Sequence, residues 1–155
     1  MQKYTCMAVL VMMVALVMLP GCGGLPEETR NRATKQVPQR IESAVRDVQN
    51  NLSGYEQIKA SDVFTSFLNP YAQRENWSEH ITTANEKIAH AKKLNEELQT
   101  LVAENNEEDL NKVNTLIQRI YAAIGEAKSA SEAPAARAVF LQKVRENAPA
   151  MVQKA

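Results

Sequence analysis

Residues that carry chemistry are scarce in this chain. Of its 155 residues, two are cysteines, two are histidines and five are glycines. The histidines, His80 and His90, would be separated by about 15 Å along a helix, whereas the ligands of one metal lie about 2 Å from a shared centre. The sequence also lacks G-x-S-x-G, H-E-x-x-H and a glycine-rich phosphate loop. We therefore expect a protein that is not an enzyme and that binds no metal or cofactor.

An excess of charge of either sign is missing as well. Lys3 is the only charged residue among the first 21, so the rest of the chain carries 17 Lys and Arg against 18 Asp and Glu. A nucleic-acid-binding protein usually carries a basic stripe, and an acidic substrate is usually steered by positive charge. The balance of charge therefore argues against nucleic acid as a partner and against an acidic substrate attracted by bulk charge.

The N-terminal residues contain the most informative pattern. Lys3 supplies positive charge, residues 7–19 form an apolar run of 13 residues, and the sequence LPGC follows and ends at Cys22. A helix needs about 20 apolar residues to cross a membrane. A shorter run before a small-residue site is typical of a signal peptide.

The LPGC sequence resembles the lipobox of bacterial lipoproteins. The resemblance implies that residues 1–21 are removed, and that Cys22 is acylated and holds the protein to a lipid bilayer. The family prefers Ala or Ser where Pro20 stands here. In enteric-type bacteria, Gly23 rather than Asp after the cysteine implies the periplasmic face of the outer membrane. With Cys6 removed and Cys22 modified, no thiol would remain for a disulfide.

The remainder divides into three segments. Residues 22–36 contain few apolar side chains, so we expect a flexible tether that buries little surface. Apolar residues at helical spacing then predict one helical domain over residues 37–148. Pro149 predicts a frayed tail over residues 149–155.

Three stripes of apolar residues repeat at intervals of three and four, which is the spacing of one helix face. The stripes are Ile41, Val45, Val48, Leu52 and Tyr55; Trp77, Ile81, Ala84, Ile88, Ala91, Asn95, Leu98 and Val102; and Leu110, Val113, Ile117, Ile120, Ile124 and Ala127. No stretch alternates apolar and polar residues as a strand would. The polar Asn95 could set the register of a coiled coil, or lie at the edge of the stripe beside Leu94.

Turn signals separate the stripes. Asn69 followed by Pro70 fits a helix start, with Asn as the cap and Pro at the first helical position. Asn105-Asn106 fits a turn, after which residues 107–109 (Glu, Glu, Asp) place negative charge at a helix N-terminus. Long arms joined by short turns predict an all-α, elongated antiparallel three-helix bundle. Ser131 and Pro134 predict a kink in the third arm or a new short helix that carries Val139, Phe140 and Val144. A four-helix bundle with this last piece folded back is the alternative.

Four aromatic side chains gather around the predicted first turn. They are Phe64, Phe67, Tyr71 and Trp77, all within 14 residues. They fit a hydrophobic plug that closes one end of the bundle. They also fit an exposed patch that binds a partner, because exposed apolar clusters often mark interfaces.

The combined pattern favours a membrane-tethered structural or protein-interaction module of the cell envelope. Its partner would be another envelope protein or a second copy of the chain. A peptidoglycan-associated spacer resembling the Braun-type murein lipoprotein is an alternative, but that family links a C-terminal Lys, and here Lys154 is followed by Ala155. A small-ligand carrier is the other alternative, although no polar side chains converge within the stripes.

Overall fold

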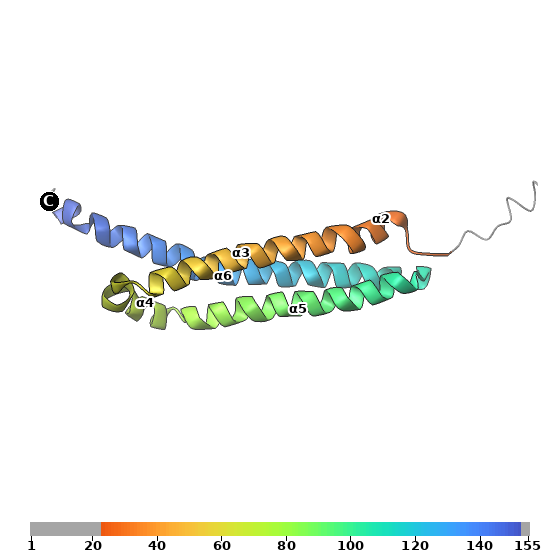
Figure 1. The fold of residues 1–155 in the computed structure, drawn as a ribbon, viewed down its shortest axis with the longest axis horizontal. Coiled ribbons are helices and arrows are strands. Elements are labelled where there is room, and N and C mark those ends of the chain that lie inside the picture. The colour runs from red at the N-terminus through yellow and green to blue at the C-terminus, as the bar shows by residue number, and fades with distance from the viewer. Residues whose placement is uncertain (1–22, 153–155) are drawn as a thin grey trace, which may run out of the picture.

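The fold is built from long helices that run side by side. In the computed structural model, which describes residues 23–152, the chain forms an N-terminal arm of three consecutive helical segments: α2 (Glu27–Asn31), the π-helical turn η1 (Arg32–Gln36) and α3 (Val37–Lys59). The turn η2 (Phe64–Leu68) and α4 (Asn69–Arg74) then cross one end. The arms α5 (Trp77–Glu104) and α6 (Leu110–Val152), joined through the short turn η3 (Glu107–Asp109), complete the bundle (Figure 1).

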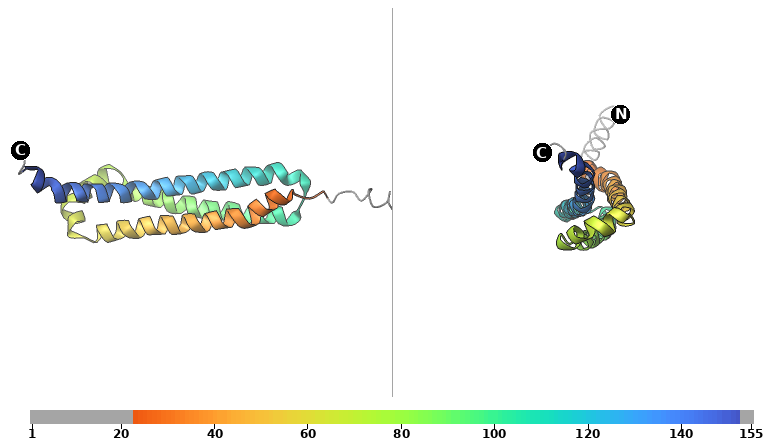
Figure 2. Two further views of the ribbon diagram at one scale, coloured as in Figure 1. Left: turned by 90° about the horizontal axis from the view of Figure 1, so that it is seen from above. Right: turned by 90° about the vertical axis from the view of Figure 1, so that its left-hand side faces the viewer.

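The three arms are antiparallel neighbours, which confirms the predicted bundle. At 1.5 Å per residue, the 28 residues of α5 span about 42 Å and the 43 residues of α6 about 65 Å. The C-terminal part of α6 therefore continues beyond the other arms, at the end opposite to residue 23 (Figure 2). We call the end near residue 23 the proximal end and the other the distal end.

The core follows the predicted stripes in three zones along the axis. The proximal zone contains larger aliphatic side chains, the middle zone is rich in alanine, and the distal zone is aromatic. Representative buried residues are Val37, Leu98 and Ile120 in the proximal zone, Ala44, Ala84 and Ala127 in the middle zone, and Tyr55, Leu68 and Trp77 in the distal zone. Asn95 lies at the edge of the core and accepts a 3.1 Å hydrogen bond from Gln99.

The prediction of a flexible tether over residues 22–36 is wrong from Gly23 onward. Residues 27–36 are helical, and Leu25 and Ala33 are buried with 2% and 0% of their surface exposed. Both belong to the same core zone as Val37 and Ile41. Ala33 extends the stripe of α3 by one turn, and Leu25, which precedes α2, packs into the same core zone.

A proline explains the π-helical turn in this arm. The N–H of Val37 bonds to the carbonyl of Arg32, five residues back, and Pro38 has no N–H to continue the ladder. The carbonyl of Ala33 instead accepts a 3.0 Å hydrogen bond from Nε2 of Gln99 on α5. The side chain of Gln99 thus supplies a donor to a backbone acceptor that proline leaves without one.

The helix start predicted at Asn69-Pro70 is confirmed in position, because α4 begins at Asn69 with Pro70 in its first turn, but the predicted capping role of Asn69 is wrong. Asn69 has helical backbone angles, and η2 leads directly into α4 because a π turn again precedes the proline. The chain reverses before and after this segment instead. It turns first at Ala60-Ser61, where the N–H of Phe64 bonds to the carbonyl of Ser61 at 3.0 Å, and again at Asn76, which has a positive φ of 51°.

Of the outcomes predicted near Pro134, the new short helix and the folded-back fourth helix are wrong, and the helix bends instead. Pro134 is buried within α6, which continues as one helix to Val152. Its C-terminal part changes direction without a turn (Figure 1), as expected for a helix bent by proline. The predicted frayed tail is therefore helical as far as Val152, and residues 153–155 lie outside the described residues. The turn predicted at Asn105 is confirmed, with a φ of 53°.

Candidate functional site

The four aromatic residues predicted to bind a partner do not form one exposed patch. Trp77 and Phe64 are buried, with 2% and 9% of their surface exposed, whereas Phe67 and Tyr71 are partly buried. Tyr55 contacts the rings of Phe64 and Trp77 edge to face, with centroids 6.1 and 6.0 Å apart. Such pairs stabilise a core beyond the area they bury. The cluster thus forms an aromatic plug at the distal end.

A polar network joins this plug to α6. The indole N–H of Trp77 donates to Glu75 Oε2 at 3.0 Å, and Arg137 Nε donates to Glu75 Oε1 at 3.2 Å. The Trp77 hydrogen bond, followed by the contact with Arg137, lowers the pKa of Glu75. The folded state therefore favours the carboxylate, and the network contributes its full stability above the ordinary glutamate pKa. This contribution is lost as the pH falls from that value through the lowered pKa of Glu75. Sequence spacing gave no signal for it, because Arg137 is 62 residues from Glu75.

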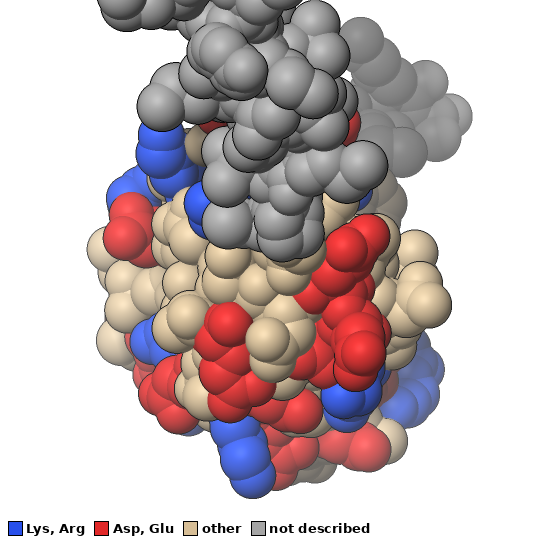
Figure 3. All heavy atoms as spheres, turned by 90° about the vertical axis from the view of Figure 1, so that its right-hand side faces the viewer, with Lys and Arg blue, Asp and Glu red and all other residues tan. Residues whose placement is uncertain are grey.

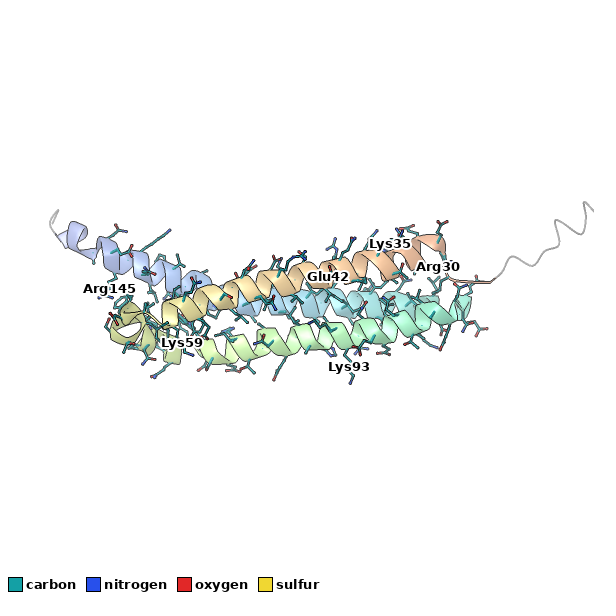
Figure 4. The ribbon with its side chains drawn as sticks, viewed as in Figure 1. Arg30, Lys35, Glu42, Lys59, Lys93 and Arg145 are labelled. Atoms are coloured by element: carbon teal, nitrogen blue, oxygen red, sulfur yellow. The ribbon has the colours of Figure 1, made fainter. Side chains whose placement is uncertain are left out.

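The partly buried aromatics line a shallow surface groove of about 410 Å³ that includes Pro70 and Arg74. Two arginines cover their rings: Arg145 lies 5.9 Å from the centroid of Phe67, and Arg74 lies 5.2 Å from that of Tyr71. Figure 4 shows Arg145 at the distal end, beside the α4 region. Each of these cation–π contacts covers one face of its ring.

At the proximal end, the residues after position 22 are held against the turn between α5 and α6. Asn105 Oδ1 accepts hydrogen bonds from the N–H of Leu25 and from Nη2 of Arg30, both at 3.1 Å. Arg30 also donates to the carbonyl of Leu25 at 3.1 Å, and Figure 4 shows this arginine at the proximal end. A side chain on Gly24 would approach Asn105 Nδ2 to 2.6 Å. A Cβ at this position would displace the Asn105 amide group, to which Leu25 and Arg30 are bound.

Replacing Asn105 with alanine is expected to release this segment and to lower the free energy of unfolding by about 1–2 kcal/mol. The variant loses the acceptor for Leu25 and Arg30. It also places alanine in the left-handed conformation, which asparagine tolerates better because its side chain can form local hydrogen bonds. Hydrogen exchange at the Leu25 amide measures the release. Asn76→Ala is the matched control, because Asn76 has the same backbone conformation and is exposed. Equal protection of Leu25 in both variants would contradict the proposed role of Asn105.

Acidic side chains gather at the proximal end. Figure 3 views this end and shows Asp and Glu over much of the surface that the grey atoms leave visible. Exposed members near the turn are Glu104, Glu107 and Glu108. Asp109 is bound by Lys112 at 2.6 Å, and this hydrogen bond lowers the pKa of the Asp109 carboxyl group. As predicted, residues 107–109 lie at the start of an arm, in the turn η3 immediately before α6. Their negative charges interact favourably with the positive N-terminal end of the α6 helix dipole.

Among the side chains that the structure describes, the most exposed large apolar ones lie at the distal end, on α6. They are Val139, Phe140 and Val144, with 44%, 55% and 43% of their surface exposed. The opposite side of the same helix, with Ala138 and Leu141, packs into the aromatic plug. The sequence analysis placed Val139, Phe140 and Val144 after a kink or in a new short helix that could fold back, and it therefore did not predict their exposure.

The remaining predicted sites bring no chemistry together among residues 23–152. His80 and His90 are both exposed, and no group of three or more potential metal-ligating side chains occurs in this part of the chain. No helix within the described range is long and apolar enough to span a membrane. The predicted signal peptide, residues 1–21, and the predicted lipidation site, Cys22, lie outside the described residues.

No protein-family model, curated protein or solved structure matches the chain.

Proposed function

We propose that this chain is a lipid-anchored protein of the bacterial cell envelope that serves as a structural or protein-interaction module. The observation that carries the proposal is the lipobox-like sequence ending at Cys22, directly before residues that are bound to the proximal end of an elongated bundle. Acyl chains on Cys22 would hold that end at a bilayer, on the periplasmic face of the outer membrane. The apolar face of α6 would then lie near the far end, about 45–50 Å away if the bundle stands upright.

One property of the bundle supports an interaction role. Its distal end exposes three large apolar side chains within six residues of α6. Exposed apolar residues grouped on one face are a common feature of protein interfaces.

Replacing Cys22 with alanine tests the anchor. In cells fed an alkyne-labelled palmitate, we expect the label on the wild-type chain and a mature N-terminus at residue 22 by mass spectrometry. The Cys22→Ala variant should carry no label and retain residues 1–21. Cys6→Ala is the matched control, because Cys6 lies in the segment that is removed, and it should behave as wild type. An unlabelled wild-type chain with its N-terminus at another residue would refute the lipoprotein assignment.

Site-specific photo-crosslinking in intact envelopes tests the interaction role. A photoreactive residue at Phe140 should capture a defined partner, whereas one at the exposed Lys93 of α5, far from the distal end (Figure 4), should not. Muropeptides linked to Lys154 would instead support the peptidoglycan spacer. A small molecule retained by the purified protein would support the carrier.

A further inference from the structure

The exposed face of α6 at the distal end is a shallow groove with a defined set of residues. We define the distal face as Glu132, Ala135, Ala136, Val139, Phe140 and Lys143, which together with Asn51 of α3 line a groove of about 640 Å³. At about 100° per residue, these six positions lie within roughly 140° of the α6 circumference. They are therefore one continuous side of a helix, wide enough to receive a second helix.

The face has an apolar centre and opposite charges at its two ends. The exposed Val139 and Phe140 lie beside the small side chains of Ala135 and Ala136. Arg137 covers one side of the Phe140 ring, 5.5 Å from its centroid. Glu132 and Lys143 are exposed at opposite ends, and neither forms an ion pair within residues 23–152.

The order of these residues is self-complementary when the helix is reversed. In an antiparallel pair centred between residues 137 and 138, Glu132 of each chain lies opposite Lys143 of the other. In the same register, Ala135 lies opposite Phe140 and Ala136 opposite Val139. Each large side chain therefore meets a small one, and each charge meets its opposite. A twofold interface requires this property, because every contact in it occurs twice.

We propose that the distal face binds the distal face of a second copy of this chain, with the two α6 helices antiparallel. Positions 132, 136, 139 and 143 follow the 4-3-4 spacing of a coiled-coil seam, and the antiparallel register aligns them with one another. A parallel pair would place Glu132 against Glu132 and Lys143 against Lys143, which repel. The charges thus select the antiparallel arrangement.

The pairing names a partner for the interaction module proposed above, and it does not require acylation of Cys22. The two proximal ends point away from each other, roughly 80 Å apart by the rise of α6. The contact area is small, so the dimer is weak in solution.

Charge reversal tests the proposal. In the detergent-purified full-length chain, sedimentation equilibrium over a concentration series should show a reversible dimer. Lys143→Glu alone places like charges together twice, and should weaken this dimer about tenfold or more. Glu132→Lys alone should do the same. The double variant restores both pairs and should bind within about threefold of wild type.

Mixing the two single variants gives the sharpest result. Each is poor at self-association, but together they restore opposite charges at both ends, so a heterodimer of wild-type strength is expected. Lys93→Glu, an exposed change on α5, is the control and should leave the dimer unchanged. Circular dichroism should show equal helicity in all variants.

Several outcomes would overturn the pairing: a wild-type chain that stays monomeric, single variants that dimerise as wild type, or a mixture that forms no heterodimer. The mass of the N-terminal peptide from the same samples reports acylation separately. An acylated monomer would therefore refute the pairing and leave the lipid anchor intact. A dimer without acyl chains would support the pairing and refute the lipid anchor.

Discussion

Replacing Trp77 with alanine is expected to lower the free energy of unfolding by about 3–5 kcal/mol, the range typical of large aromatic truncations in a core. Only 2% of the Trp77 surface is exposed, and its ring contacts Tyr55 in the aromatic plug. The truncation leaves a cavity where α5 begins. It also removes the indole N–H that donates to Glu75, so the carboxylate keeps Arg137 as its remaining side-chain partner.

Urea denaturation followed by circular dichroism measures this loss. Phe140→Ala is the matched control at the same end of the molecule, because 55% of its surface is exposed, and it should change the stability by no more than about 0.5 kcal/mol. Comparing these two variants distinguishes a side chain that stabilises the fold from one that is exposed for binding. A Trp77→Ala variant as stable as wild type would mean that this side chain is not part of the plug.

The long-range architecture followed from the apolar stripes because burial on a helix face is a periodic signal. Ile41, Val48, Ile88 and Leu98 are buried as the spacing predicts. The turn at Asn105 also followed from sequence, since asparagine tolerates the left-handed conformation found there.

The proximal end could not be predicted in the same way. The residues from Gly23 to Arg30 look like a solvated tether because they contain a single large apolar side chain, Leu25. They are held by hydrogen bonds to Asn105, which is 80 residues away from Leu25 in the chain. A pattern within one segment carries no information about such a partner.

The misplaced helix boundaries share one cause, which is proline inside a helical path. Pro38 and Pro70 each follow a π-helical turn that absorbs the missing backbone donor, so the helix continues where local rules predict a boundary. Pro134 is instead accommodated within one continuous helix. This error hid the exposed face of α6, because Val139, Phe140 and Val144 seemed to belong to a separate piece that could fold back and cover them.

Replacing Pro134 with alanine is accordingly expected to raise the free energy of unfolding by about 1–2 kcal/mol. Proline in a helix interior costs about 3 kcal/mol relative to alanine, because it lacks the N–H and clashes with the preceding turn. The gain is reduced because the buried ring of Pro134 fills space, and each methylene lost from a core costs about 0.8 kcal/mol. Urea denaturation measures the balance between these two terms.

Pro38→Ala is the comparison that identifies the cause. At that site Gln99 already donates to the carbonyl of Ala33, and the π turn has relieved the clash, so alanine has less to restore. We expect the gain there to be smaller than at Pro134. If Pro134→Ala were destabilising instead, the packing of its ring against the core would outweigh the backbone cost. The proline would then be a fixed part of the bend that directs the distal face away from the bundle.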